Sequence, residues 1–213
     1  ALLLGVQGSH VAPLPLLPSS VAALIVDRHG SDEQRQRLLP DVVTGTTILT
    51  VAVQEYLDDR LTQPSTTFED GLLHGTKVLV EYFDVASSLL VTVRTPDGHR
   101  CVLVDGTAAG IPRREGSSTR RQPIWAVDFD ATPAEPVGDD TTVDALLDHL
   151  RLGICATQLG VTERALSMTA EYTSTREQFG RPIATFQAVG QRLADQFVNV
   201  GGIRLVTLSA AWR

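Results

Sequence analysis

Three kinds of side chain in this sequence could do chemistry: histidines, paired acids and clustered arginines. The five histidines are His10, His29, His74, His99 and His149. They show no metal-ligand spacing with one another or with a cysteine, so surface or capping roles are favoured. The pairs Asp58-Asp59 and Asp139-Asp140 lie in polar stretches that are typical of solvated turns. No P-loop, Rossmann or Gly-x-Ser-x-Gly motif occurs, and we expect no metal site.

Arginine is the remaining candidate, because a guanidinium can bind phosphate groups with paired hydrogen bonds. Arg113-Arg114 and Arg120-Arg121 form a basic loop in an acidic chain, and solubility alone would explain them. Arg176 lies near Phe179 and Gln187, where it could bind a pyrophosphate beside an apolar ring. The alternative is that Arg176 balances a helix dipole and that Phe179 is a core residue at a tight turn.

The chain is acidic overall, since 18 Lys and Arg stand against 25 Asp and Glu and give a formal net charge of −7 for 213 residues. A pI of about 5.2 argues against a nucleic-acid binder or a basic membrane-surface protein. Two cysteines are too few for a disulfide framework or a Cys-rich zinc site. No membrane span or signal-peptide pattern is present, so we expect a cytoplasmic location. Because the sequence starts at Ala1 without Met and stops at Arg213 inside a helical pattern, we expect a piece of a longer protein.

The elements that would position these residues change character twice along the chain. The first 40 residues are predicted to be helical, with interruptions at prolines. Ser19 or Ser20 would cap a helix over Val21–Arg28, and Ser31 would cap a second helix that Pro40 ends.

The middle of the chain is rich in β-branched residues and predicts a small barrel or sandwich of antiparallel strands. The turn signal at residues 95–98 predicts a hairpin. Residues 58–70 and 106–122 are predicted to be loops. The predicted strands are Thr46–Val53, Leu72–Tyr82, Ser88–Arg94, Arg100–Val104 and Pro123–Phe129.

The last third has the helical period of three and four residues. A long helix is predicted from Val143, capped by Thr141 or Thr142 and broken at Gly180-Arg181-Pro182. A second helix is predicted from about Thr185, which makes an antiparallel helical hairpin. The predicted fold class is α+β, with residues 1–45, 46–138 and 139–213 as helical, β and helical domains.

The segment between these two helices carries a recognisable motif. Thr175–Ile183, followed by Phe186-Gln187-Ala188, resembles the TRxQFGxPIxxFQ signature of the acyl-CoA dehydrogenase family. Further matches are Gln158–Val161, His29–Gln34 with Leu38–Pro40, and Gly75–Lys77. The family fold implied is a helical domain, a β domain and a four-helix bundle, in a chain that extends beyond this sequence at both ends. The implied reaction is α,β-desaturation of an acyl-CoA thioester, with a carboxylate as base and FAD as hydride acceptor.

The resemblance also says which family parts this chain lacks. Some family members place the base just before an arginine on the helix that matches residues 143–172, and here that position is Leu150, before Arg151. In most members the base lies beyond Arg213. Leu150 itself fits a core position. No catalytic residue is therefore assigned in this sequence.

Two segments match the family's flavin-ring region poorly. A family loop rich in glycine corresponds to Gln54–Arg60, where Glu55 is kept but no glycine remains and Asp58 and Asp59 have arrived. We expect these carboxylates to repel a pyrophosphate. On the next strand Leu79 replaces an aromatic residue and Glu81 replaces a threonine, so we expect this chain's own flavin-ring pocket to be damaged.

The motif between the helices is intact, and in the family it reaches FAD bound mainly by a neighbouring subunit. The resemblance assigns cofactor contacts to six residues: Arg176, Gln178, Phe179, Ile183, Phe186 and Gln187. It adds a CoA or FAD phosphate contact as the alternative role for Arg120 and Arg121.

The motif that would contact a neighbour's FAD is intact, whereas the chain's own flavin-ring region matches the family poorly. This combination is expected of a partner subunit in a hetero-oligomeric acyl-CoA dehydrogenase. This chain resembles the subunits of the actinobacterial α2β2 enzymes of steroid side-chain degradation, and the implied partners are a homologous subunit and electron-transfer flavoprotein. Two alternatives stay open. One is a self-sufficient homotetrameric dehydrogenase with its Glu past Arg213, and the other is a flavin-free acyl-CoA-binding scaffold.

Overall fold

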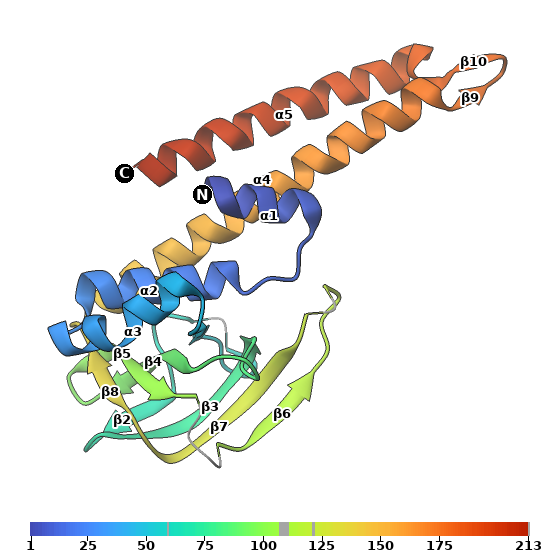
Figure 1. Ribbon diagram of the computed structural model, residues 1–213. Helices are drawn as coiled ribbons and strands as arrows, with labels where there is room; N and C mark the ends of the chain where they lie inside the picture. The colour runs from blue at the N-terminus through green and yellow to red at the C-terminus, as the bar shows by residue number, and fades with distance from the viewer. Residues whose placement is uncertain (59, 107–110, 121, 213) are drawn as a thin grey trace. The chain divides into compact units, whose positions relative to one another are not determined.

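A computed structural model describes residues 1–58, 60–106, 111–120 and 122–212. The chain divides into two compact units, one of Pro15–Leu150 and one of Ala1–Leu14 with Arg151–Arg213 (Figure 1). Helix α4 (Thr142–Thr175) begins in the first of these units and continues in the second. The expected three-domain division at residues 45 and 138 stays a prediction.

In the unit Pro15–Leu150, helix α2 (Leu16–His29) begins earlier than predicted. A cap at Ser19 or Ser20 was wrong, because Pro18 fits in the first helical turn, where its missing N–H breaks no helical hydrogen bond. The Ser19 hydroxyl instead accepts a hydrogen bond from the Leu49 backbone at 3.3 Å.

Helix α3 (Asp32–Thr44) confirms its predicted start but not its predicted end. Ser31 forms a capping box with Gln34, whose backbone N–H donates to the Ser31 hydroxyl at 3.1 Å. Termination at Pro40 was wrong, since this proline lies inside the helix. The helix ends at Gly45, which takes the left-handed conformation at φ 78°.

The strands of this unit form one eight-stranded sheet in the order β6-β7-β3-β2-β4-β5-β8, with β1 beside β4. The strands are β1 Leu49–Ala52, β2 Thr67–Glu69, β3 Leu72–Glu81, β4 Ser88–Thr95, β5 Gly98–Asp105, β6 Arg113–Gly116, β7 Ile124–Pro133 and β8 Glu135–Val137. The β4–β5 hairpin is confirmed, with Thr95 paired to Gly98. The sheet is mixed, because β1 and β2 both run parallel to β4.

Two short strands lie where only loops were expected, which makes the loop prediction wrong there. Strand β2 falls within 58–70 and β6 within 106–122. All four residues of β6 are exposed, and they pair with β7 through the backbone. Without a buried face, β6 has no alternation of apolar residues that could reveal it in sequence.

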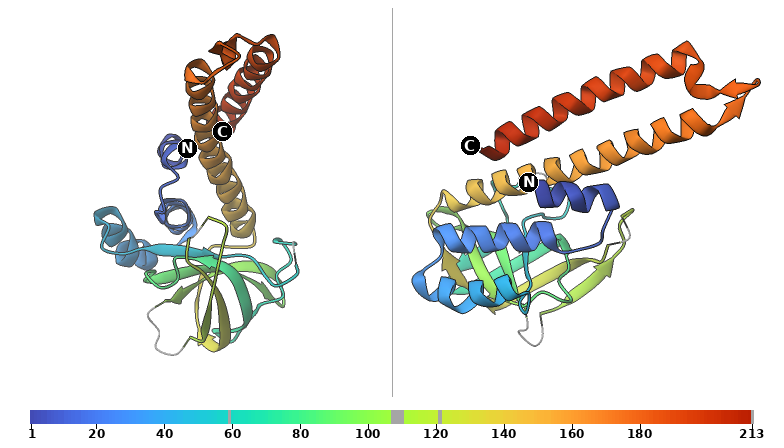
Figure 2. Two further views of the ribbon diagram at one scale, coloured as in Figure 1. Left: turned by 90° about the vertical axis from the view of Figure 1, so that its right-hand side faces the viewer. Right: turned by 45° about the horizontal axis from the view of Figure 1, so that its top comes forward.

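Helices α2 and α3 lie on the same side of the sheet (Figures 1 and 2). One apolar cluster joins α2 and α3 to strands β1, β4 and β5 and to the first turns of α4, and Leu150 packs against it. This confirms Leu150 as a core residue. A second cluster lies among the strands, with Leu73, Val127 and Phe129 among its members.

In the other unit, α1 (Leu2–His10) packs closely against α4. A Cβ atom added to Gly8 would lie 2.0 Å from the Thr157 carbonyl oxygen, and one added to Gly160 would lie 1.8 Å from the Gly5 carbonyl oxygen. The two backbones therefore touch, and only glycine fits at these positions. Gly8 and Gly160 fix the packing of α1.

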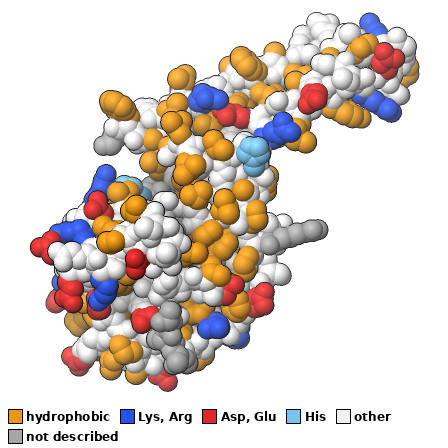
Figure 3. All heavy atoms as spheres, in the orientation of Figure 1, with side chains coloured by type: hydrophobic (Ala, Val, Ile, Leu, Met, Phe, Trp, Pro, Cys, Tyr) orange, Lys and Arg blue, Asp and Glu red, His pale blue; other side chains and the backbone are white. Residues whose placement is uncertain are grey.

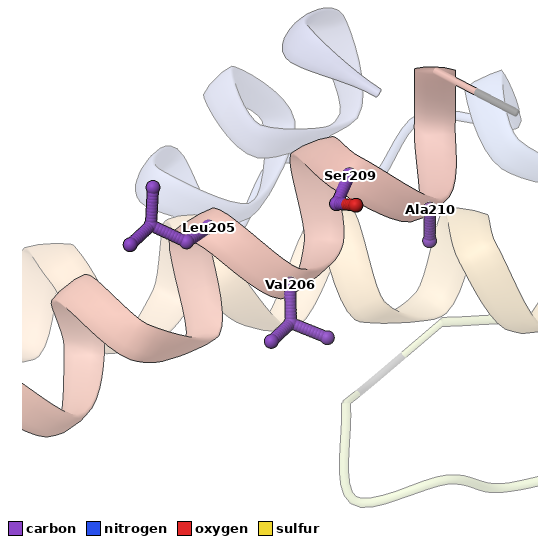
Figure 4. A pocket seen from close by; sticks show the side chains of 4 residues that line it. All are labelled: Leu205, Val206, Ser209 and Ala210. Carbon is purple, nitrogen blue, oxygen red and sulfur yellow. The ribbon is translucent and has the colours of Figure 1, made fainter.

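Helices α4 and α5 (Gln187–Trp212) are joined through β9 (Glu177–Gln178), β10 (Arg181–Pro182) and a 3-10 turn at Ile183–Thr185 (Figure 2). Many of the apolar side chains that give α4 and α5 their helical period are exposed, and Figure 3 shows them as hydrophobic atoms on the surface of these two helices. Exposed members include Val161, Met168 and Tyr172 on α4 and Phe197 on α5. Leu205, Val206, Ser209 and Ala210 line a shallow hollow on α5 (Figure 4).

Among the described residues, no helix is long and apolar enough to cross a bilayer.

Candidate functional site

Residues Arg176–Phe186, here called the connecting hairpin, link α4 to α5 through a tight two-strand turn. Gln178 pairs with Arg181 and Glu177 with Pro182 in antiparallel register. The two residues of the turn, Phe179 and Gly180, both have positive φ, at 58° and 76°. Two central residues of this kind define a type I′ turn. The conformation is unstrained for Gly180 but costly for Phe179, which is unusual for an aromatic residue.

One hydrogen bond across the connecting hairpin and two local bonds hold its backbone. The Ile183 N–H donates to the Arg176 carbonyl oxygen at 2.9 Å, and the Arg176 N–H donates to the Tyr172 carbonyl oxygen at 2.8 Å. The Thr185 hydroxyl donates to the Pro182 carbonyl oxygen at 2.7 Å. These bonds fix the backbone from which the motif side chains project.

The hairpin brings two aromatic rings and one guanidinium into contact. The centroids of Phe179 and Phe186 are 6.2 Å apart with ring planes at 86°, an edge-to-face arrangement. Phe179 is 92% exposed, so the core interpretation of this ring was wrong. The Arg181 Cζ lies 4.2 Å from the Phe186 centroid. Arg181 was not among the predicted contacts, because it stands at an unspecified position of the family signature and within a predicted helix break.

The polar residues assigned to a cofactor lie on the connecting hairpin, apart from Gln187, which is the first residue of α5. Arg176, Gln178 and Gln187 are exposed, while Ile183 and Phe186 are half-buried. Within the part of the chain that the structure describes, no ion pair engages the Arg176 guanidinium. An exposed guanidinium and an exposed ring on one short segment suit an anionic ligand that also has a planar face. The donor set therefore fits a dinucleotide, and the contacts themselves stay predictions.

The two segments matched to the flavin-ring region are also adjacent in space. The Val78 N–H donates to the Gln54 carbonyl oxygen at 2.8 Å, which joins the loop after β1 to strand β3. One residue along, Lys77 Nζ donates to Glu55 Oε1 at 2.8 Å. Lys77 is fully buried and Glu55 is 7% exposed, so this ion pair lies inside the sheet unit. Sequence matching identified both residues but gave no sign of their pairing.

Glu55 is the acceptor of a dense hydrogen-bond network. Its carboxylate accepts from the backbone N–H of Ser65 at 2.7 Å and of Thr66 at 2.9 Å. It also accepts from the hydroxyls of Ser65 at 2.5 Å and Thr66 at 2.6 Å. Lys77 Nζ makes a further bond to the Thr92 hydroxyl at 3.2 Å. Glu55 therefore closes the connection between β1 and β2 against β3.

The protonation of this pair follows from burial and hydrogen bonding. Burial raises the pKa of Glu55, but the bonds from Lys77, Ser65 and Thr66 outweigh it and lower that pKa to about 2. Burial lowers the pKa of Lys77, and the Glu55 carboxylate opposes that shift. We take the pair to be ionised, because every Glu55 partner is a donor that favours the charged carboxylate.

The other carboxylates of this region have partners as well. Asp58 accepts from Arg60 Nε at 3.0 Å and from its terminal nitrogen at 2.8 Å. Glu81 forms an ion pair with Arg120. The repulsion expected from these acids is therefore smaller than the sequence suggested, and Arg120 is already engaged by a carboxylate. Asp59 and Arg121, which carried the same expectations, lie outside the described residues.

Two leucines of this region take a backbone conformation that favours glycine. Leu57 and Leu79 both have φ 55°, and both side chains are exposed. Leu79 lies at an irregularity in the pairing of β3 with β7, between Lys77 and Val80. Two exposed leucine side chains therefore project from this region in a conformation that favours glycine. No group of three or more potential metal ligands occurs among the described residues.

Comparisons with known proteins identify the family to which these segments belong. Residues 141–213 match the family model of the acyl-CoA dehydrogenase C-terminal domain. Acyl-CoA dehydrogenase FadE27 of Mycobacterium tuberculosis is 39% identical over 210 residues, which cover 97% of this chain and 56% of that protein. The chain thus spans little more than half the length of this relative.

Solved structures give the same family. A variant of the Tcur3481–Tcur3483 steroid ACAD superposes with a TM-score of 0.94 at 41% identity, over 98% of this chain and 58% of that one. The ChsE4–ChsE5 complex from Mycobacterium tuberculosis superposes with a TM-score of 0.90 at 36% identity, over 99% and 59%. The α+β fold and the intact motif of the connecting hairpin agree with these matches, and the chain belongs to the acyl-CoA dehydrogenase family.

Proposed function

We propose that this chain is part of a subunit of an FAD-dependent acyl-CoA dehydrogenase that completes the FAD site of a partner subunit. The observation that carries the proposal is the connecting hairpin, where Arg176 has no ion pair among the described residues and Phe179 is exposed. FAD would supply the hydride acceptor for desaturation of an acyl-CoA thioester. Arg176 would bind its pyrophosphate, and Phe179 and Gln187 would contact its rings.

The partner and the substrate follow from the same relatives. The Tcur3481–Tcur3483 structure is described as a steroid ACAD, and ChsE4–ChsE5 is a complex of two proteins. We infer an α2β2 hetero-oligomer with a homologous subunit, a steroid side-chain CoA thioester as substrate, and electron-transfer flavoprotein as electron acceptor. Cys101 and Cys155 are both free thiols, which suits the cytoplasm.

In this assembly the sheet unit would lack a working flavin-ring site of its own. Leu57 and Leu79 project where glycine and an aromatic residue are found in the family, and Glu81 replaces a threonine. Leu150 cannot accept a proton, so the base would come from outside the residues described. A self-sufficient homotetramer and a flavin-free scaffold are the outcomes that would contradict this proposal.

Flavin stoichiometry tests the proposal directly. The full-length protein is purified alone and together with a homologous acyl-CoA dehydrogenase subunit, and bound flavin is measured by absorbance. We expect little flavin on the protein alone and about one per unlike pair. One flavin per chain on the protein alone would indicate a homomeric enzyme, and a colourless complex would indicate a scaffold.

A further inference from the structure

Arg181 is held in an unusual position for an exposed arginine. Its guanidinium lies over the ring of Phe186, with Cζ 4.2 Å from the centroid, and Phe186 in turn meets Phe179 edge to face. This distance is within the range of a cation–π contact. The contact restricts the side chain before any ligand arrives.

A cation–π contact on one side of the guanidinium does not use its hydrogen-bond donors. The five N–H groups of arginine point outward in the plane of the group, so a stacked arginine can still bind an oxyanion with two parallel hydrogen bonds. Within the described parts of the chain, no carboxylate pairs with Arg181. An ordered side chain also loses less conformational entropy on binding.

The register of the hairpin places Arg181 beside the motif residues. Arg181 lies directly opposite Gln178, and cross-strand partners project from the same face of a ladder. Arg176 is tied to the start of the 3-10 turn by the bond from the Ile183 N–H. One short hairpin therefore carries two exposed arginines, against one carboxylate at Glu177. Its net charge favours an anion.

We propose that Arg181 is a second anion-binding residue of the connecting hairpin, ordered by Phe186 to bind the pyrophosphate of a dinucleotide together with Arg176. The inference rests on the proposed function and adds to it a residue that the family motif leaves unspecified. Arg176 supplies one guanidinium, and the Arg181–Phe186 stack supplies the other. Because Arg181 takes part in no covalent step, we expect it to contribute only to the affinity for the dinucleotide.

The test measures the FAD dissociation constant of the complex with a homologous subunit, by flavin fluorescence. Arg181→Gln is expected to weaken FAD binding about tenfold, the size of one charge-assisted contact. Arg181→Lys keeps the charge but loses the planar stack and is expected to recover part of that loss. Arg192→Gln, which removes an exposed arginine from α5, is the matched control and should leave FAD binding unchanged.

Two further measurements separate binding from a structural effect. FAD affinity of the Arg181→Gln complex should fall less steeply with rising salt, because one ion contact is gone. In the Phe186→Leu background, Arg181→Gln should cost less than in the unmodified chain, and additive losses would overturn the ordering role of Phe186. If the Gln variant does not assemble, the FAD affinity of the Arg181→Lys complex still decides, because unchanged affinity there would overturn the stacked role of Arg181.

The inference and the proposed function fail in different ways. If Arg176→Gln weakens FAD binding while Arg181→Gln does not, the role of Arg181 is wrong and the proposed function stands. If the unmodified complex binds no FAD, the proposed function itself is wrong.

Discussion

In the connecting hairpin the Arg176 guanidinium is exposed, whereas in the sheet unit the Glu55 carboxylate is buried under bonds from Lys77, Ser65 and Thr66. Both residues match family motifs, yet their surroundings differ. A charge with every hydrogen-bonding site occupied can organise the protein but can bind nothing else. An exposed charge without a partner contributes little to stability and stays available to a ligand.

The difference teaches that a match to a family motif does not by itself leave a residue available to a ligand. Glu55 and Lys77 match the family residue types, but the loop beside Glu55 contains no glycine and has Leu57 in the left-handed conformation. The ion pair fixes the loop whether or not a flavin is near. Stability should therefore depend on the sheet unit, and flavin affinity on the hairpin.

The largest expected effect comes from breaking the buried pair. Lys77→Met leaves the Glu55 carboxylate buried without its cation, and we expect a loss of about 3–5 kcal/mol in the free energy of unfolding. Urea unfolding followed by circular dichroism measures it. Arg37→Met removes one partner of the exposed Arg37–Glu135 pair and should cost less than about 1 kcal/mol. Equal losses in the two variants would show that burial of the Lys77 pair is unimportant.

The same pair should make stability depend on pH. The folded pKa of Glu55 is about 2, below its ordinary value of 4.5, so the unfolded chain takes up the proton first. The stabilisation is fully present above pH 4.5 and is lost as the pH falls towards 2, by about 3 kcal/mol in total. Urea unfolding between pH 6 and pH 3 should show a smaller decline for Glu55→Gln. Parallel declines would place the titrating group elsewhere.

Arg176→Gln sharpens the comparison from the other side. We expect FAD affinity of the complex to fall by roughly 2 kcal/mol, as for a lost charge-assisted hydrogen bond, with the free energy of unfolding nearly unchanged. Flavin fluorescence titration and urea unfolding of the same preparation measure the two quantities. A large loss of stability would mean that Arg176 serves the fold.

The smallest expected effect concerns the turn of the hairpin. Gly180 has φ 76°, where an added Cβ is strained, so Gly180→Ala should lower the free energy of unfolding by about 1 kcal/mol. Gly201→Ala is the matched control, since Gly201 lies inside α5 with open space around its Cβ position and no positive φ. That variant should be neutral or stabilising by up to about 1 kcal/mol. Thermal unfolding distinguishes them, and a stabilising Gly180→Ala would rule out the type I′ turn.

Sequence patterns predicted the regular parts of the fold well. The period of the last third located α4 and α5, the 95–98 turn located the β4–β5 hairpin, and Ser31 located the start of α3. Each of these signals is local, because it depends on residues within a few positions of one another. These signals failed at β6, which pairs through its backbone and has no alternation of apolar residues. They failed also at Pro40, which lies inside α3 instead of ending it.

The candidate site was predictable only where the residues are contiguous. The motif from Thr175 to Gln187 is one contiguous segment, so its members could be named from the sequence. The Glu55–Lys77 pair joins residues that are 22 positions apart in the chain. The proposed role of Arg181 depends on its contact with the Phe186 ring. Such relations depend on distances that no local pattern encodes.

The sequence by itself determined the family resemblance, the α+β order of elements and the residues of the connecting hairpin. Only the tertiary structure decided which charges are paired and which are free. The Asp58, Glu81 and Arg120 side chains have partners, while the Arg176 side chain has no ion pair among the residues described. The physical reason is that electrostatic interaction and desolvation depend on separation and burial in space, and both are set by packing between elements distant along the chain.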